Sequence, residues 1–345
     1  MEQRHYIIGS VPSKAGLIPR ISTHLRAKDY LGATMVRWNI RRNNYRVAPG
    51  LYAIGVPDER SDVIVTANYK LSFDTVRKHL HELNVWLLVL DTKGINVWCA
   101  AGKGAFGTEE LIRSIRVTSL ETIISHRRLI LPQLGAVGVA AHLIKQESGF
   151  SVLYGPVRAS DIQAFIRSNY RASIEMRRVK FGFFDRLTLV PNDTIHDIRY
   201  LLPVLAAAFI VSGLSTIGFL FQQAFERGLA AMQNIVFGYC AGVVLTPLLL
   251  PYIPTRAFAS KGYIVGALLA LLLFAAGALG NSVFDVIAWF FFMSGASSFL
   301  AMNFTGASTY TSLSGVKKEM KIAVPVQVAS GVISLLLFIT GKIVQ

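Results

Sequence analysis

Five long apolar stretches in the second half of the chain restrict its fold more than any other feature of the sequence. They cover, approximately, residues 200–221, 229–250, 262–281, 284–304 and 322–341. A helix needs about 20 apolar residues to cross a hydrocarbon core of about 30 Å. Four stretches contain no formally charged residue, and 284–304 contains only Asp285. A small soluble domain cannot bury five such runs, so the sequence predicts an all-α transmembrane bundle of five helices.

The charged residues are concentrated in the first part of the 345-residue chain. Residues 1–198 hold 27 Lys and Arg against 17 Asp and Glu, whereas the remainder holds 8 against 3. We therefore expect two domains, a soluble one over 1–198 and a transmembrane one over 199–345. The first twenty residues are polar, which predicts no signal peptide.

The loops between the predicted spans indicate an orientation. One side would receive five basic residues, Arg256, Lys261, Lys317, Lys318 and Lys321, and the other only Arg227 and Lys342. The side richer in Lys and Arg is normally cytoplasmic. The sequence thus predicts a multi-pass protein of the cytoplasmic membrane, with its N-terminal domain in the cytoplasm and its C-terminus outside.

The soluble part alternates between strand-like and helix-like segments. The predicted strands are Gly50–Gly55, Asp62–Thr66, Val85–Leu90, Leu129–Leu131 and Ser151–Tyr154. The predicted helices are Phe73–Glu82, Thr108–Ile115, Ala136–Ile144 and Ser160–Ser168. Such alternation is typical of an α/β fold with a mostly parallel, Rossmann-like sheet. Ligands of these folds bind at the carboxyl ends of the strands.

Three segments would meet at that edge of the sheet: Thr66–Tyr69, Asn96–Lys103 and Leu131–Gly135. Neither a phosphate-binding loop nor a dinucleotide fingerprint is present, since Gly102–Gly107 has the wrong spacing and context. This argues against a membrane transporter or sensor with a nucleotide-binding α/β domain, which is the alternative from another functional class. No Asp-x-His-x-x-Gly stretch, a cobalt-ligand motif of many corrinoid proteins, occurs either.

The chain has two cysteines. Cys99 lies in the predicted soluble domain, and Cys240 lies within the second predicted span. We expect no intramolecular disulfide, and two cysteines cannot hold an iron–sulfur cluster, which needs about four thiolates. A lone cysteine is most often a buried, inert residue. Metal ligation, or nucleophilic catalysis with His79, His81, His126 or His142, are the other possibilities. The small Ala100 and Ala101 and the glycines at 102, 104 and 107 would leave room for a bulky ligand.

The run Asn96-Val97-Trp98-Cys99-Ala100-Ala101-Gly102-Lys103 resembles the signature of membrane-anchored corrinoid proteins that methylate inorganic mercury in anaerobic microbes. The resemblance extends over Val65–Asp74, Leu131–Gly135 and Tyr154–Arg158. These stretches also resemble the corrinoid-binding domain of the corrinoid iron–sulfur protein of acetyl-CoA synthesis. This chain differs from that protein in lacking cluster-binding cysteines and a barrel domain, and in having the multi-span anchor.

The resemblance implies a cobalamin-type corrinoid whose own lower base is displaced, with Cys99 as the axial ligand of its cobalt. The thiolate would favour transfer of the methyl group as a carbanion equivalent, which Hg(II) accepts. It implies that Asn96 holds the loop, that Trp98 packs near the ring and that Lys103 contacts a corrin amide or phosphate, unless Lys103 is merely solvated. The remaining expected cofactor-binding residues are Thr66, Asn68, Tyr69, Val97, Ala100, Ala101, Gly102, Leu134 and Gly135.

The function implied by the resemblance is corrinoid-dependent methyltransferase activity on Hg(II), giving methylmercury. In the alternative within the same class, a membrane corrinoid protein passes methyl groups to another acceptor. A ferredoxin-like iron–sulfur protein would supply electrons and a folate-linked protein the methyl group. The basic residues Arg177, Arg178 and Lys180 would contact anionic membrane lipid or such an acidic partner. We expect no nucleic-acid partner.

Overall fold

The computed structural model describes residues 5–215, 218–280, 282–306 and 313–344. These residues form two compact units that divide between Lys180 and Phe181, although Arg37–Asn39 group with the second unit. This division lies earlier in the chain than the expected one after residue 198. The first long helix of the second unit begins at Phe183, and its opening turns contain charged residues that an apolar-run criterion passes over.

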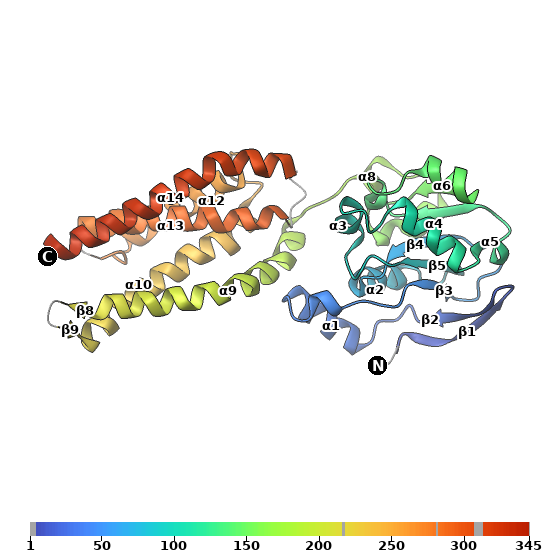
Figure 1. Cartoon of the computed structure of the whole chain (residues 1–345), viewed down its shortest axis with the longest axis horizontal. Helices are drawn as coiled ribbons and strands as arrows, with labels where there is room; N and C mark the ends of the chain where they lie inside the picture. Colours follow the sequence, from blue (N-terminus) through green and yellow to red (C-terminus); the bar gives the residue numbers. More distant parts are fainter. Residues whose placement is uncertain (1–4, 216–217, 281, 307–312, 345) are drawn as a thin grey trace. The chain divides into compact units, whose positions relative to one another are not determined.

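The first unit contains a seven-stranded, mostly parallel sheet in the order β1-β2-β3-β5-β4-β6-β7 (Figure 1). Its strands are β1 (Ile7–Ser13), β2 (Gly16–Ile21), β3 (Gly50–Ile54), β4 (Val63–Ala67), β5 (Val85–Leu90), β6 (Arg128–Leu131) and β7 (Ser151–Tyr154). Only the pairs β1–β2 and β3–β5 are antiparallel. The predicted α/β fold is thereby confirmed, and each of the five predicted strands lies within one residue of an observed one.

Helices and short turns connect the strands of the first unit. They are α1 (Ala27–Arg37), α2 (Lys70–His79), α3 (Val97–Gly102), α4 (Thr108–Val117), α5 (Leu120–Ile123), α6 (Ala141–Ser148), α7 (Ile162–Arg167) and α8 (Ile174–Arg177), with 3-10 turns η1 (Arg42–Asn44), η2 (Gln133–Gly135) and η3 (Ala159–Asp161). Two predicted helices are displaced, because α2 begins at Lys70 rather than Phe73 and α6 begins at Ala141 rather than Ala136. The strands β1 and β2 and the helix α1 were not predicted.

The central strands are buried on both faces, which explains their continuous apolar sequences. Alternate residues of β5 belong to two separate cores: Trp86, Leu88 and Leu90 to one, and Val85, Leu87 and Val89 to the other. The first core includes residues of α3, α4, α5 and α6, and the second includes residues of α2 and α7. This two-period alternation places α3, with Cys99, on one defined face of the sheet.

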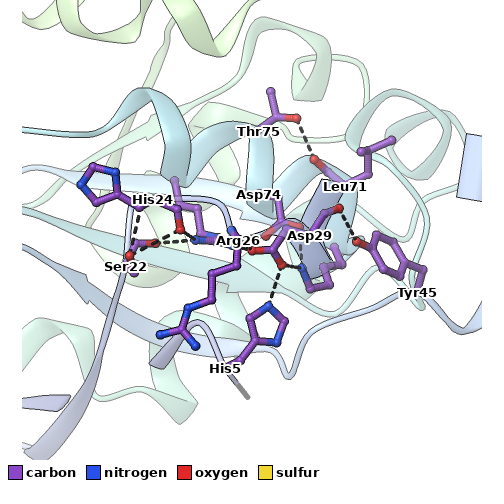
Figure 2. A network of polar contacts seen from close by, with 11 residues as sticks. His5, Ser22, His24, Arg26, Asp29, Tyr45, Leu71, Asp74 and Thr75 are labelled. Atoms are coloured by element: carbon purple, nitrogen blue, oxygen red, sulfur yellow. Dashed lines mark hydrogen bonds and ion pairs between the residues drawn. The ribbon is translucent and has the colours of Figure 1, made fainter. Parts of the chain in front are cut away.

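A buried network of charged side chains joins the segment before β1 and the start of α1 to α2 (Figure 2). Asp29 accepts hydrogen bonds from Lys70 Nζ at 2.6 Å and from Arg77 Nη2 at 2.9 Å. Asp74 contacts the same two cations, at 2.5 Å and 2.8 Å respectively. His5 Nε2 lies 2.8 Å from Asp29 Oδ1. Arg77 is fully buried, and Asp29 is 2% exposed.

The two carboxylates of the network, Asp29 and Asp74, balance the two cations Lys70 and Arg77. A buried charge is costly unless an opposite charge compensates it. Burial opposes ionisation of Asp29, but hydrogen bonds from Lys70, the Arg26 backbone and His5 outweigh it and hold the pKa of this carboxyl well below its usual range. Arg77 also donates to the carbonyl oxygens of Ser22 and His24, at 2.6 Å and 3.0 Å. The network therefore fixes the chain segment that follows β2 against α2.

The second unit is helical. It comprises α9 (Phe183–Gly213), the two-residue strands β8 (Leu214–Ser215) and β9 (Gly218–Phe219), α10 (Phe221–Cys240), a π-helical turn (Ala241–Leu245), α11 (Thr246–Leu249), α12 (Phe258–Ala275), α13 (Val283–Asn303), the 3-10 turn η5 (Phe304–Gly306) and α14 (Leu313–Val344). Among the described residues, five helical segments are long and apolar enough to cross a bilayer. Many apolar side chains of α9 and α14 are exposed, as lipid contact would require.

The first predicted span, 200–221, needs correction at its end. The helix stops at Gly213, and a two-stranded turn leads to α10, which begins at Phe221. A Cβ atom on Gly213 would lie 2.5 Å from the Phe219 ring, so a larger residue at this position would displace that ring. The apolar character continues through the turn, and for this reason hydropathy alone extended the span too far.

Candidate functional site

Three segments follow parallel strands at the carboxyl edge of the sheet. Ala67 at the end of β4 pairs with Leu90 at the end of β5, and Ile64 of β4 pairs with Ile130 of β6. The residues that continue from these strands are Asn68 and Tyr69, the run to α3, and η2. Helix α3 and η2 are in contact. The topology thus brings the three predicted segments to the same edge.

Cys99 lies in the first turns of α3, on a helix held by its N-terminal cap. The Asn96 side-chain oxygen accepts a hydrogen bond from the Cys99 backbone amide at 2.9 Å. Trp98 is 36% exposed and Cys99 is partly exposed, whereas Val97 packs into the core. The thiol side of this short helix is therefore open toward solvent.

The open space near the thiol comes from glycine rather than from the two alanines. Ala100 and Ala101 are buried in the core and do not line an open face, contrary to the expectation that they leave room for a flat ligand. A Cβ atom on Gly102 or Gly104 would meet no atom within 4 Å. Lys103, which caps the end of α3, is exposed.

Asn68 organises the loop that leads from β5 to α3. Its side-chain oxygen accepts hydrogen bonds from the Thr92 amide at 3.1 Å, the Thr92 hydroxyl at 2.9 Å and the Gly94 amide at 2.9 Å. Its amide nitrogen donates to Asp91 at 3.0 Å. Because Asn68 is 1% exposed and fully engaged in these bonds, it positions the site rather than presenting a free group to a ligand.

Closely packed glycines hold η2 and the following loop against α3. A Cβ atom on Gly135 would lie 2.6 Å from the Phe106 ring, and one on Gly138 would lie 2.3 Å from the Phe106 carbonyl oxygen. Gly138 also approaches the backbone of Ala101, to 3.0 Å by the same measure. This approach explains why residues 136–140 form a loop instead of the predicted helix start. Leu134 is half-buried and packs against the same core.

Thr66 and Tyr69 are buried at the end of β4. Thr66 Oγ1 has no hydrogen-bond partner among the described residues, although Thr66 is only 1% exposed. Tyr69 packs edge-on to Tyr45, and the Arg42 guanidinium lies 5.9 Å from the centre of its ring. An unsatisfied buried hydroxyl is uncommon and calls for an explanation. Thr66 alternates along β4 with Val65 and Ala67, which belong to the core that includes α3, so its side chain points to the α2 face and not to the Cys99 face of the sheet.

The histidines considered as partners of a nucleophilic Cys99 do not hydrogen-bond to its thiol in the described structure. His126 bonds to the Ser61 carbonyl at 3.1 Å, near the amino ends of β4 and β6 and thus away from the Cys99 edge. His79 and His81 lie at and beyond the end of α2. Burial lowers the pKa of His79. Throughout the described part of the chain, no histidine is hydrogen-bonded to the Cys99 thiol.

The basic residues that precede the second unit differ in their contacts. Arg177 donates to the Gln133 side chain at 2.7 Å, so it supports η2 within the first unit. Arg178 and Lys180 lie 3.9 Å and 3.3 Å from Glu175, in exposed ion pairs. Exposed pairs of this kind contribute little to stability and remain accessible to a partner or to lipid.

The segment that carries the candidate site is similar in sequence to known proteins. Residues 36–166 match the sequence model of the family described as the CO dehydrogenase/acetyl-CoA synthase delta subunit. The chain is 37% identical over 131 residues to the acetyl-CoA decarbonylase/synthase complex subunit gamma of Methanocaldococcus jannaschii. The aligned region covers 37% of this chain and 26% of that protein. It is 32% identical over 152 residues to the corrinoid/iron-sulfur protein large subunit of Moorella thermoacetica, covering 41% of this chain and 33% of that protein.

These matches confirm the similarity to the corrinoid iron–sulfur protein, and they are confined to part of each molecule. The chain spans about a quarter to a third of the length of these relatives. The matched region 36–166 contains the ends of β4, β5 and β6 and Cys99. The similarity thus concerns the domain that carries the candidate site.

Proposed function

We propose that the first unit binds a corrinoid and takes part in methyl transfer. The observation that carries this proposal is the partly exposed Cys99 thiol on a capped helix at the carboxyl edge of the sheet, inside the region similar to the corrinoid/iron-sulfur protein. Ligands of open α/β sheets bind at this edge. The second unit would anchor the domain to a membrane by its five apolar helices.

The residues at the edge fit a large, flat cofactor. A Cβ atom on Gly102, three residues after Cys99 on α3, would meet no atom within 4 Å, which leaves open space at this end of the helix. Trp98 would cover part of the ring and Lys103 would reach a peripheral amide or phosphate. Asn96, Asn68, Gly135 and the core residues Val97, Ala100 and Ala101 would hold the loops. When bound, the corrinoid would supply the cobalt centre that carries a methyl group.

Cys99 is proposed as the residue of this chain that would hold the metal of the corrinoid. Its thiol is partly exposed on the capped helix α3. The ligand would be the thiolate form, which a bound cation stabilises. The thiolate would supply a negatively charged, electron-rich donor to the metal.

Two acceptors are proposed for the methyl group. The resemblance of Asn96–Lys103 to the mercury-methylation signature supports Hg(II), with methylmercury as product. The names of the similar proteins, which refer to acetyl-CoA decarbonylase/synthase and to a corrinoid/iron-sulfur protein, support the broader function of passing methyl groups to another acceptor. The broader function rests on more observations, and Hg(II) is the specific acceptor to be tested.

The proposed partners come from the family resemblance. Two cysteines cannot hold a cluster, so any electrons would come from another protein. The resemblance to the mercury-methylating corrinoid proteins implies a ferredoxin-like iron–sulfur protein for this role and a folate-linked protein as the methyl donor. The net charge of +15 suits contact with an acidic partner or with anionic lipid. The basic residues near the ends of the apolar helices, which include Lys261 at the start of α12 and Lys317, Lys318 and Lys321 at the start of α14, support a place in the cytoplasmic membrane, with the first unit in the cytoplasm and the C-terminus outside.

The test begins with the absorption spectrum of the full chain, purified without oxygen and reconstituted with cobalamin. We expect strong visible corrinoid bands in the wild type. Cys99→Ala should retain the corrinoid with a changed cobalt(III) spectrum and should lose methyl transfer, whereas Cys240→Ala should resemble the wild type. A colourless wild-type protein would reject the corrinoid proposal.

The acceptor is tested separately, in anaerobic cells that carry the gene together with a ferredoxin-like partner. Methylmercury formation that depends on Cys99 would support Hg(II) as the acceptor. A corrinoid-loaded protein that forms no methylmercury would leave the broader methyl-transfer function and reject Hg(II). Wild-type rates from Cys99→Ala would reject the role of the thiolate.

A further inference from the structure

The helical unit contains a cavity of about 860 Å³ between α9, α10 and α13. Residues of all three helices line it: Asn192, Asp193, His196, Asp197, Tyr200, Leu201, Val204, Ile235, Tyr239, Phe292, Ala296, Phe299, Leu300 and Asn303. This volume is within the range of about 300–1,000 Å³ that is usual for small-molecule sites. It is far larger than a bare ion needs.

The relative directions of the helices determine which residues share a level in this cavity. Tyr239 donates a hydrogen bond to the Thr194 carbonyl at 2.8 Å, and a Cβ atom on Gly228 would lie 3.0 Å from the Phe209 ring. These pairs show that α9 and α10 are antiparallel. Asn303 donates to Asp197 at 3.2 Å, which places the end of α13 at the level of Asp197.

The cavity consequently has a polar end and an apolar end. Asp193, Asp197, Tyr239 and Asn303 lie at one level, together with Asn192 and His196. The apolar lining follows from there, toward the end of α9 and the start of α13. It consists of Leu201 and Val204 of α9, Ile235 of α10, and Phe292 and Ala296 of α13.

The polar end is lined by acidic side chains, of which Asp197 is the most buried. Two carboxylates, those of Asp193 and Asp197, line the cavity, and none of its described lining residues is Lys or Arg. Asp197 is 7% exposed, and a buried carboxylate is costly unless a cation or several donors compensate it. The nearby Arg199 is exposed and lies over the Tyr200 ring at 4.7 Å, outside the lining.

We propose that this cavity binds an organic ammonium cation with an apolar tail. The carboxylate of Asp197 receives the ammonium group, with Asp193 beside it, and the ring of Tyr239 adds a favourable cation–π surface. The tail lies among Leu201, Ile235 and Ala296. An ammonium headgroup of a bilayer lipid and a free alkylamine share this chemistry, and the site is independent of the corrinoid edge in the first unit.

The experiment compares octylammonium with 1-octanol, which has the same tail without the charge. Binding is measured by calorimetry on the full chain in uncharged maltoside micelles. We expect octylammonium to bind at least tenfold more tightly than octanol. Asp197→Asn should remove that preference, and Asp285→Asn, the same change at a carboxylate outside the cavity, should change affinity less than twofold. Equal affinities for the two probes, or a wild-type preference in Asp197→Asn, would overturn the proposal.

A second variant keeps the test decisive if Asp197→Asn does not fold. Ala296→Trp fills the apolar end and leaves both carboxylates in place. It should weaken octylammonium binding at least tenfold while ethylammonium binding stays within twofold. An unchanged octylammonium affinity would contradict the placement of the tail. Competition then identifies the natural source: displacement of octylammonium by phosphatidylethanolamine, but not by phosphatidylglycerol, supports a lipid headgroup, and displacement by neither supports a free amine.

Discussion

Removing the carboxylate of Asp29 should destabilise the first unit more than any exposed substitution. In Asp29→Ala, Asp74 would be the only carboxylate of the described residues that still pairs with Lys70 and Arg77. Arg77 is fully buried and Lys70 is 8% exposed, so one cationic charge would be uncompensated in the interior. Breaking a buried ion pair from one side costs about 3–5 kcal/mol.

The measurement is urea unfolding of the full chain in micelles, followed by hydrogen exchange of peptides from β4 and α2. For a urea dependence of about 2 kcal/mol per M, the expected loss lowers the midpoint by about 2 M. Glu59→Ala, which removes a carboxylate 2.9 Å from Lys14 on the exposed surface, should leave the midpoint within experimental error. If Asp29→Ala shifts the midpoint no more than Glu59→Ala does, the charge-pairing argument is refuted.

The pH dependence of the urea midpoint tests the same assignment of Asp29 as a buried, ionised partner of Lys70 and Arg77. The pKa of Asp29 is lower in the folded protein than its ordinary value of about 3.9. Its contribution to the free energy of unfolding is therefore complete above that ordinary value and decreases as the pH falls through the lower, folded pKa. The difference between wild type and Asp29→Ala should thus be constant near neutral pH and should shrink only in strong acid. A difference that disappears at pH 6 would contradict this assignment.

Further predictions concern the carboxyl edge of the sheet. Gly138→Ala should lower the melting temperature because its Cβ atom would lie 2.3 Å from the Phe106 carbonyl oxygen, whereas Gly102→Ala meets no atom within 4 Å and should melt like the wild type. If the corrinoid proposal is right, Gly102→Ala should nevertheless retain less corrinoid, as read from the visible spectrum; equal retention would place the ring elsewhere. Thr66→Val removes a buried hydroxyl that has no partner in the described chain, so the variant should be at least as stable as the wild type in urea unfolding. A large loss of stability in Thr66→Val would mean that the hydroxyl is satisfied within the protein.

The central sheet could be predicted because its strands are buried on both faces and read as short apolar blocks. Strands β1 and β2 were not predicted, because most of their residues are exposed or half-buried and Pro12, Gly16 and Pro19 interrupt the pattern. Helix α1 has only two buried residues, Asp29 and Val36, and therefore shows no apolar stripe. Its role depends on a contact between Asp29 and Arg77, which are 48 positions apart. No local pattern reports such a pair.

At the candidate site, the sequence indicated the segments but not the roles of their residues. Strand–helix alternation was sufficient to bring Asn68, Cys99 and Gly135 to one edge. It could not show that Ala100 faces the core while Gly102 is open, because both depend on how the short helix α3 rotates against the sheet. Nor could it show that Asn68 is used entirely in holding the loop. The polar cavity of the second unit was missed because the polar start of α9 lies outside the apolar run.

The side-chain amide of Asn68 couples the backbone hydrogen bonds of the loop before α3, so that we expect this loop to open as one segment. The backbone amides of Thr92 and Gly94 donate to the same oxygen atom, so a movement of Asn68 removes one hydrogen bond from each of them, while the Thr92 amide keeps its 3.1 Å contact with the Leu90 carbonyl oxygen. Hydrogen exchange at these two amides should then occur through one shared opening, with equal free energies, rather than by independent fraying.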